Sequence, residues 1–258
     1  MTDETPDAVL TEVRDGVLVI TINRPEARNA INGAVARGVA AALDRLDGED
    51  ELRVGVLTGS GGFFSSGMDL KGFLSGDVPI VEGRGLGGLT ERPPRKPLIA
   101  AVEGYAVAGG FELVLACDLV VAGAGARFGV PEVKRGLVAG AGAAVHLPQR
   151  IPPAIALEML LTGDPIDADR AAALGLVNRV VPDGTAVDAA VELAGAVAAN
   201  GPLAVAVTKQ IALSAPDWGS AERWAKQGEL MGPVFVSEDA QEGARAFAEK
   251  RAPVWKGR

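Results

Sequence analysis

Two strand-like runs of hydrophobic residues open the chain, at residues 8–13 and 17–22. Asp15 and Gly16 stand between them, and an Asp-Gly pair is a strong signal for the tight turn of a β-hairpin. The pattern therefore predicts an antiparallel pair of strands at the start of the chain.

A stripe of aliphatic residues follows at helical spacing. It consists of Ile31, Val35, Val39, Leu43 and Leu46. One face of an amphipathic α-helix repeats in this way, so we predict a helix over this stretch.

Short buried strands then alternate with helices. The runs at residues 54–58, 98–102 and 119–121 are typical of strands, and those at 69–74 and 111–116 of short helices. This alternation favours β-α-β units, which form parallel sheets.

The second half of the chain is mainly helical in pattern, from about residue 139 onward. A strand at residues 178–181 interrupts it. Helices at residues 221–231 and 237–251 carry large apolar side chains, which must cover a core or a partner. We expect an α/β core followed by a helical carboxyl-terminal region.

Residues 75–96 are rich in Gly, Pro and charge, and we expect them to form a long mobile loop. Gly83, Gly85 and Gly88 formally match G-x-G-x-x-G. A dinucleotide fingerprint follows a strand and opens a helix, whereas this one leads into two prolines. We therefore assign no nucleotide site here.

Composition narrows the class of protein. The 258 residues are 48% hydrophobic and 22% charged, as in globular domains. A net charge of -8 and 4% aromatic residues argue against nucleic-acid binding. Residues 1–6 are unlike a secretory or transit peptide, and no apolar run approaches the ~20 residues of a membrane span. We expect a cytoplasmic protein.

The chain contains a single cysteine, Cys117, and a single histidine, His146. An intrachain disulfide is excluded, and a zinc site built from several Cys or His lacks ligands. No G-x-S-x-G motif supports a serine-histidine hydrolase. We interpret both residues as structural and expect no metal.

Glu112 is the only carboxylate in the apolar segment 104–117. Its neighbours leave little room for the polar face of a surface helix, so we expect it to be buried. Desolvation raises the pKa of a carboxyl group, which suits general acid-base chemistry. Gly109 and Gly110 would begin the helix, and free N–H groups there can stabilise an anion.

Residues 63–71 have a similar form, because a glycine-containing loop leads into a short helix. Alone, this segment could be an ordinary helix start capped near Asp69. Glu132 lies close to Lys134 and Arg135, and alone it would be read as a solvated surface charge.

Several short motifs follow one another in a fixed order. They are Asn23-Arg24-Pro25, Arg28-Asn29-Ala30, Ser66-Gly67-Met68-Asp69, Gly109-Gly110-Phe111-Glu112-Leu113, Phe128-Gly129-Val130-Pro131-Glu132, Leu161-Thr162-Gly163 and Ala173-Leu174-Gly175-Leu176-Val177-Asn178. Together they resemble the crotonase family, the enoyl-CoA hydratase/isomerase superfamily, over residues 8–258. Within it, the chain is most similar to actinobacterial-type enoyl-CoA hydratases.

The resemblance implies an α/β crotonase (ClpP/crotonase-like) fold, a spiral of β-β-α units. Residues 1–195 would form the spiral core with the catalytic site. Residues 196–258 would form a helical trimerisation region, giving a homotrimer or a hexamer made of two trimers.

The resemblance also implies an acyl-CoA thioester substrate. The backbone N–H groups of Met68 and Gly109 would form an oxyanion hole for the thioester oxygen. Glu112 and Glu132 would be the catalytic carboxylates that hold a water molecule between them.

Contacts to CoA follow from the same resemblance. Arg28 lies in the family's CoA-binding segment, and Lys71 is a further candidate beside the oxyanion loop. Phe247 and Lys250 would reach the adenine and 3′-phosphate from a neighbouring subunit. No cofactor is expected, since coenzyme A is part of the substrate.

The activity implied is hydration of a trans-2-enoyl-CoA to a 3-hydroxyacyl-CoA. Isomerisation of the double bond usually needs only the carboxylate at the Glu132 position, so the presence of Glu112 disfavours it. A dehydratase or lyase and a non-catalytic CoA-thioester binder stay open. Ala108 and Ala139 replace a common glycine and proline, which leaves the shape of the acyl pocket open.

Overall fold

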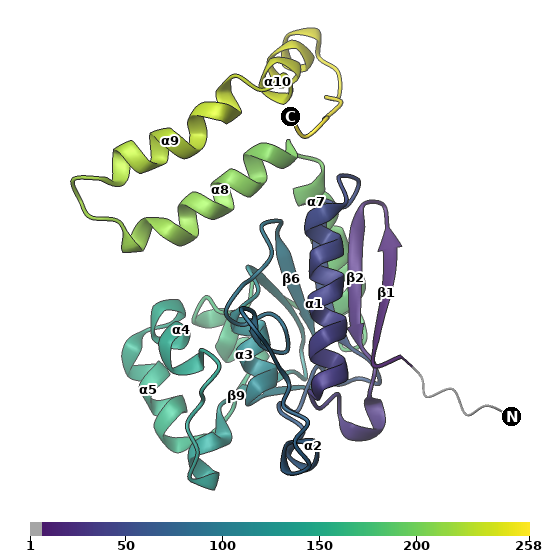
Figure 1. Cartoon of the computed structure of the whole chain (residues 1–258), viewed down its shortest axis with the longest axis vertical. Coiled ribbons are helices and arrows are strands. Elements are labelled where there is room, and N and C mark those ends of the chain that lie inside the picture. The colour runs from purple at the N-terminus through teal and green to yellow at the C-terminus, as the bar shows by residue number, and fades with distance from the viewer. Residues whose placement is uncertain (1–6) are drawn as a thin grey trace, which may run out of the picture.

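The computed structural model describes residues 7–258, and a six-stranded sheet forms its centre (Figure 1). The strand order is β1, β2, β3, β6, β8 and β11. β1 and β2 are antiparallel, and the other neighbours are parallel. The strands are Val9–Arg14 (β1), Val17–Ile22 (β2), Val54–Gly59 (β3), Leu98–Val102 (β6), Leu119–Gly123 (β8) and Arg179–Val181 (β11).

The first two strands form the predicted hairpin. Arg14 pairs with Val17, so Asp15 and Gly16 alone make the turn, with φ of 49° and 78°. Positive φ at both central residues is what a two-residue hairpin turn requires. The Asp-Gly prediction is confirmed.

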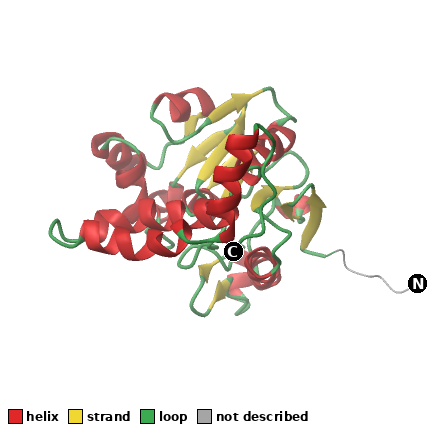
Figure 2. Ribbon diagram, turned by 90° about the horizontal axis from the view of Figure 1, so that it is seen from above, coloured by secondary structure: helices red, strands yellow, loops and turns green. Residues whose placement is uncertain are grey.

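Helices α1 (Gly33–Gly48) and α7 (Ala186–Ala198) cover opposite faces of this sheet (Figures 1 and 2). Successive residues of a strand point to opposite faces. Leu18 accordingly packs in the core beneath α1, whereas Val19 packs with the alanines of α7. Asn32 accepts a hydrogen bond from the Val35 amide at 3.0 Å and thereby caps α1, so the predicted helix is confirmed.

A second, three-stranded sheet turns the chain into a spiral. It contains Tyr105–Val107 (β7), Arg127–Gly129 (β9) and Ile166–Asp167 (β10), in the order β10, β9, β7. Helix α3, Gly109–Leu115, follows β7 and is entirely buried. Two successive turns, β6-β7-α3 and β8-β9-η2 (η2, Pro131–Arg135), thus pass through a strand of each sheet before a helical segment, as expected for the crotonase spiral.

Further helices surround this core. They are the helices Leu70–Leu74 (α2), Ala143–Arg150 (α4), Pro153–Thr162 (α5) and Ala168–Ala173 (α6), and the 3-10 turns Pro25–Ala27 (η1), Pro131–Arg135 (η2) and Ala215–Asp217 (η3).

The prediction of a long mobile loop at residues 75–96 is wrong. The segment contains a small hairpin, Ile80–Val81 (β4) with Gly85–Leu86 (β5), and residues 85–90 are buried. Its glycines permit close packing: a Cβ on Gly88 would lie 2.4 Å from the Ala36 carbonyl oxygen of α1. Glycine marks close approach here as well as turns.

The last helices extend away from the sheet (Figure 1). They are α8 (Pro202–Ser214), α9 (Arg223–Phe235) and α10 (Glu238–Glu249), which confirms the helices predicted at residues 221–231 and 237–251. In the described chain, no single helix is long and apolar enough to span a membrane. The segments Ala186–Ala198 and Pro202–Asp217 are long and apolar enough only when they are taken together, and the chain bends by 105° between them.

Candidate active site

Glu112 projects from the buried helix α3, and its side chain accepts two backbone hydrogen bonds. Its Oε1 lies 2.7 Å from the amide nitrogen of Ala141 and 3.1 Å from that of Ala143. Only 4% of the residue is exposed, which confirms the predicted burial. Burial raises the pKa of Glu112, while these two N–H groups and the nearby His146 oppose that rise.

Glu132 lies in the turn η2 and presents a carboxylate oxygen without a partner. Within residues 7–258, no group donates a hydrogen bond to its buried Oε2. Burial raises the pKa of Glu132, and the negative charge of Glu112 raises it further, against the opposing effects of its own backbone amide and Arg135. The charge of Glu112 therefore favours the protonated form of Glu132.

The N–H groups of Met68 and Gly109 lie at the junction of two closely packed segments. A Cβ on Gly67 would lie 2.9 Å from the Gly109 nitrogen, and one on Gly109 would lie 3.4 Å from the Met68 nitrogen. In the described part of the chain neither amide donates to a protein acceptor. Two free N–H groups side by side can bind one oxyanion.

Hydrogen bonds hold the Met68 segment in place. Ile31 donates from its amide to the Gly67 carbonyl and accepts from the Asp69 amide, both at 2.8 Å. The buried Ser65 hydroxyl donates to the Asn29 carbonyl at 2.8 Å, and its oxygen accepts from the Gly67 amide at 3.2 Å. The segment that carries Met68 is therefore fixed before any substrate arrives.

Ala108, directly before α3, has an unusual backbone conformation, with φ of 52° and ψ of -132°. Residues with a side chain rarely adopt this region, which glycine enters freely. Ala108 thus keeps a strained backbone conformation directly before Gly109, whose amide it orients.

The predicted CoA contacts fall into two groups. Arg28 and Lys71 are exposed, and the Arg28 carbonyl accepts from the Ser66 amide at 3.0 Å, two residues from Met68. Phe247, which is 88% exposed, and Lys250 belong to the end of α10, far from α3 and α4 in Figure 1. A single chain thus does not bring this second pair to the site.

Sequence reasoning missed three features of the site. The amides of Ala141 and Ala143 bind Glu112, and the only local signal was the glycines around them. Leu86, from the segment predicted to be mobile, lies 2.7 Å from the position that a Gly109 Cβ would take. Its methyl group therefore forms a wall beside the two free amides.

Cys117 is buried, as predicted, and its thiol donates to the Leu113 carbonyl at 3.3 Å. Burial raises the pKa of this thiol, which keeps it protonated and unreactive. His146 was interpreted as structural, yet it lies close enough to Glu112 to affect the carboxyl group's pKa.

The spiral fold, with two free amides, one buried carboxyl group and one half-buried carboxyl group, defines a class of enzyme that can stabilise an enolate-like oxyanion and move protons next to it. The model of the enoyl-CoA hydratase/isomerase family matches residues 12–258. The chain therefore belongs to this family and is a crotonase-type enzyme.

Three relatives show how near the similarity is. The enoyl-CoA hydratase EchA19 of Mycobacterium tuberculosis is 44% identical, with 98% of this chain and 97% of that protein covered. The carnitinyl-CoA dehydratase of Salmonella typhi is also 44% identical, over 94% of this chain and 95% of its own length. A crystal structure of an enoyl-CoA hydratase from M. tuberculosis H37Rv is 58% identical, with a TM-score of 0.96, covering 98% of this chain and all of that one.

Proposed function

We propose that this enzyme adds water reversibly to a trans-2-enoyl-CoA and forms a 3-hydroxyacyl-CoA. The observation that carries the proposal is the pairing of the buried Glu112 and the half-buried Glu132, whose pKa values are both raised, with the free amides of Met68 and Gly109. Retention of both carboxylates favours hydration over isomerisation.

The residues divide the reaction between them. The amides of Met68 and Gly109 bind the thioester oxygen and stabilise the negative charge that develops there, an effect of ~3 kcal/mol for each donor. The carboxyl groups of Glu112 and Glu132 hold a water molecule. One accepts its proton as the oxygen bonds to C3, and a proton is delivered to C2 to complete the addition.

The direct test follows the absorbance of the conjugated thioester of crotonyl-CoA. We expect the wild-type enzyme to remove this absorbance. With Glu112→Gln or Glu132→Gln, the absorbance should decrease about 10²–10⁴-fold more slowly. Both substitutions keep the side-chain shape, so folding and CoA-ester binding should survive. Near-normal turnover in both variants would refute the mechanism.

A second candidate concerns direction: the physiological substrate would be a 3-hydroxyacyl-CoA, which the same reversible reaction dehydrates. Dehydration needs the same carboxylates, and a relative of equal identity is named a carnitinyl-CoA dehydratase. A panel of enoyl-CoA and 3-hydroxyacyl-CoA esters that differ in length and branching shows which acyl group gives the highest kcat/KM. A protein that binds these esters without turning any of them over would instead be a non-catalytic CoA-thioester binder.

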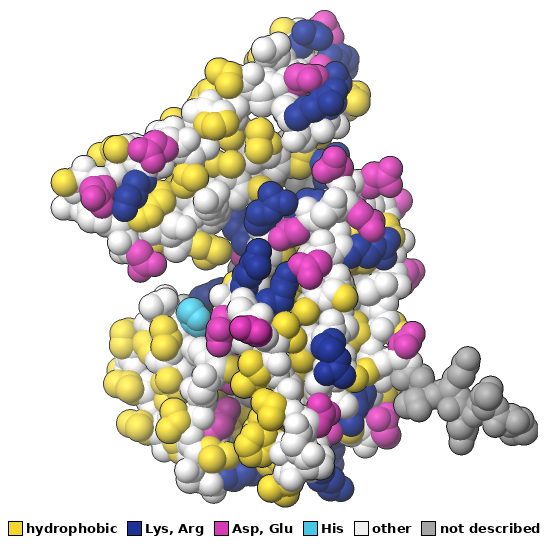
Figure 3. All heavy atoms as spheres, viewed as in Figure 1, with side chains coloured by type: hydrophobic (Ala, Val, Ile, Leu, Met, Phe, Trp, Pro, Cys, Tyr) yellow, Lys and Arg dark blue, Asp and Glu magenta, His cyan; other side chains and the backbone are white. Residues whose placement is uncertain are grey.

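We further propose that the active assembly is a trimer or a pair of trimers. Neither α8 nor α9 contains a buried residue in the described chain, and large side chains there and nearby are exposed. These are Leu213, Trp224, Phe235, Val236 and Phe247, and Figure 3 shows hydrophobic side chains over these helices. A second subunit covering them would bring Phe247 and Lys250 to its own CoA site.

The remaining expectations complete the proposal. We place the division between the catalytic core and the assembly region at residues 195 and 196, close to the end of α7. The residues of the site supply the acid, base and oxyanion donors, so the reaction needs no cofactor beyond the CoA of the substrate. We expect the enzyme to act in the cytoplasm on acyl-CoA metabolites.

A further inference from the structure

The last residues of the chain run back along α10 and bind a buried carboxylate. Asp239, which is 5% exposed, accepts hydrogen bonds from the Lys256 amide at 2.7 Å and the Gly257 amide at 2.9 Å. Its own amide donates to the Arg258 carbonyl at 3.1 Å. Both oxygens of Asp239 are thus occupied by the tail. We call residues 251–258, together with Asp239, Glu242 and their bonds, the C-terminal clasp.

Glu242, one turn further along α10, holds the beginning of the same tail. Its two oxygens accept from the Arg251 guanidinium at 2.6 and 3.0 Å. One of them also accepts from the Val254 amide at 2.9 Å. A bidentate bond of this kind fixes direction as well as distance.

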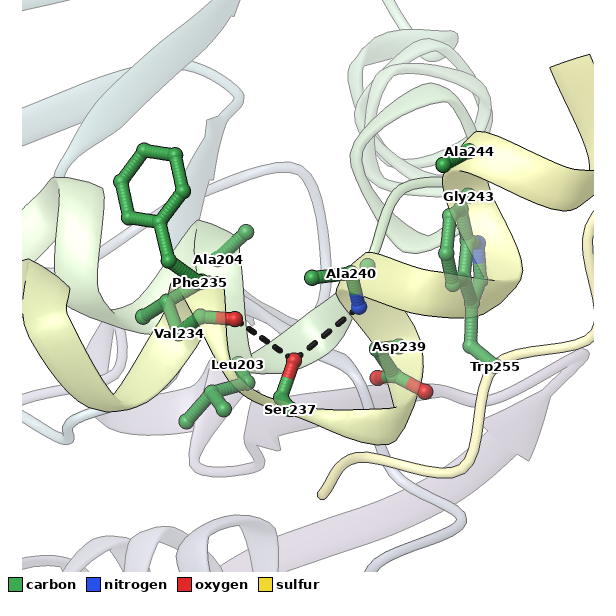
Figure 4. Close-up of a pocket in the computed structure, with 11 residues that line it drawn as sticks. Leu203, Ala204, Val234, Phe235, Ser237, Asp239, Ala240, Gly243, Ala244 and Trp255 are labelled. Carbon is green, nitrogen blue, oxygen red and sulfur yellow. Dashed lines mark hydrogen bonds between the residues drawn. The ribbon is translucent and has the colours of Figure 1, made fainter.

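Trp255 connects the clasp to the rest of the molecule. Its indole N–H donates to the carbonyl of Ala199, directly after α7, at 2.8 Å. Its ring covers two glycines, because a Cβ on Gly243 or Gly201 would meet the ring at 3.3 or 3.7 Å. Figure 4 shows the ring beside Gly243 of α10. The tail therefore ties α10 to the end of the helix that covers the central sheet.

Packing alone does not hold α10 there. A cavity of about 270 Å3 lies between α8, the end of α9 and α10, lined by Leu203, Val234, Ala240 and Ala244 (Figure 4). Ser237 joins α9 to α10 by donating to the Val234 carbonyl at 2.7 Å, but this contact lies at the first turn only. Beyond that first turn, the hydrogen bonds that tie α10 to other segments come from the clasp.

The opposite end of α10 carries the two residues proposed to act in a neighbouring site. Phe247 is exposed, and Lys250 ends the helix with a left-handed φ of 53°, directly before Arg251 of the clasp. A change in the tail is therefore transmitted to Lys250 without passing through any other element.

We propose that Asp239 is a positioning residue for CoA binding, because through the C-terminal clasp it sets where Phe247 and Lys250 stand when they meet the nucleotide end of the substrate. The inference rests on the proposed function. Asp239 touches neither the substrate nor the reacting atoms. Its effect therefore falls on affinity for the CoA moiety and leaves the chemical step unchanged.

The test compares two thioesters of the same acyl group, crotonyl-CoA and crotonyl-pantetheine, with Asp239→Asn. An asparagine amide would face the Lys256 or Gly257 N–H, so one bond is lost. We expect KM for crotonyl-CoA to rise about tenfold, the size of losing one hydrogen bond to a charged group. KM for crotonyl-pantetheine and kcat for both esters should stay at wild-type values.

Two comparisons make the result specific. Glu222→Gln removes the same charge but breaks only an exposed pair with Lys226, outside the clasp, and we expect it to leave both KM values unchanged. Trp255→Phe removes the bond to Ala199 and the outer ring atoms that lie over Gly243, so it should reproduce part of the Asp239→Asn effect. Hydrogen exchange should become faster in the α10 amides of both clasp variants.

The outcomes separate this inference from the proposed function. If Lys250→Glu raises KM for crotonyl-CoA and Asp239→Asn does not, the CoA contact stands and the clasp has no positioning role. An equal rise for both esters, or a fall in kcat, would show general damage to the fold and overturn the inference. If Lys250→Glu itself has no effect, the proposed CoA contact is wrong and the inference fails with it.

Discussion

Helices α3 and α8 are both mainly apolar, yet they differ in how far the single chain buries them. All seven residues of α3 are buried, whereas α8 has no buried residue in the described chain. Helix α3 therefore buries its hydrophobic surface within the chain, whereas α8 leaves part of its hydrophobic surface exposed. An apolar surface that the chain does not cover itself is the usual mark of an interface.

The same contrast divides the site. The free amides and both carboxyl groups come from the core, whose hydrogen bonds hold the Met68 segment and the Glu112 carboxyl group. The proposed contacts to the nucleotide end of CoA, Phe247 and Lys250, stand on the open region instead. We infer that the chemistry is built into one chain, whereas tight binding of CoA depends on a second.

Deletion of residues 236–258 should have the largest effect. The variant loses α10 and the two proposed CoA contacts, each worth about tenfold in affinity. We expect a lower oligomeric state together with a fall of about a hundredfold in kcat/KM for crotonyl-CoA. Light scattering and steady-state kinetics measure both, and a fully active monomer would contradict the shared site.

The second prediction concerns the attachment of α8 to the core. The Lys209 ammonium donates to Asp118 at 2.7 Å and to the carbonyls of Pro94 and Lys96 at 2.8 and 3.0 Å. Lys209→Met removes one partner of a largely buried pair, which costs about 3 kcal/mol. Urea unfolding should show this loss. Lys226→Met breaks only an exposed pair with Glu222 at the start of α9, so a similar loss there would show that the buried bonds of Lys209 have no special part in attaching α8 to the core.

Mixed oligomers sharpen the comparison further. Glu112→Gln subunits have an altered catalytic core but keep Lys250 after α10. Lys250→Glu subunits keep the catalytic core but lose Lys250. In a random equal mixture of subunits in a closed ring, about a quarter of the sites combine an intact core with an intact neighbouring α10. We expect refolding the two together to restore low-KM activity that neither variant has alone. Simple addition of the separate activities would show that Lys250 does not act on a neighbour.

Local patterns predicted the elements that depend on local physics. The Asp15-Gly16 turn, the aliphatic stripe of α1 and the burial of Glu112 all follow from neighbouring residues, and all three are confirmed. Strands such as β7 and β9 were not predicted, because three residues are too few to show the alternation of a strand.

Features that depend on distant contacts could not be predicted in this way. The glycines of residues 85–88 were interpreted as loop residues, although they allow close packing against α1 and α3. Glu132 alone resembled a surface charge, because its burial and its proximity to Glu112 arise only when η2 folds against the core. The family resemblance supplied the pairing that the local pattern lacked.

The last prediction, with the smallest expected effect, concerns the energetic cost of burying the Glu112 carboxyl group. Since burial raises the pKa of Glu112 in the folded state, the folded protein binds this proton more tightly than the unfolded chain does. The tighter binding of this proton stabilises the folded protein fully below the ordinary pKa of glutamate. That stabilisation is lost as the pH rises through the raised pKa of Glu112. Glutamine carries no such charge, and its oxygen can still accept from Ala141 and Ala143.

Glu112→Gln should therefore melt at the same temperature as the wild type near pH 4 and at a higher one at pH 8. We expect a difference of about 2–4 °C, the shift that roughly 1 kcal/mol gives a chain of this size. Loss of the Glu112 charge also removes one cause of the raised pKa of Glu132, so both effects have the same sign. The exposed-site control Glu192→Gln should show no such pH dependence. A Glu112→Gln protein that melts lower than the wild type at pH 8 would show that the two amide bonds to the charged carboxylate outweigh its burial.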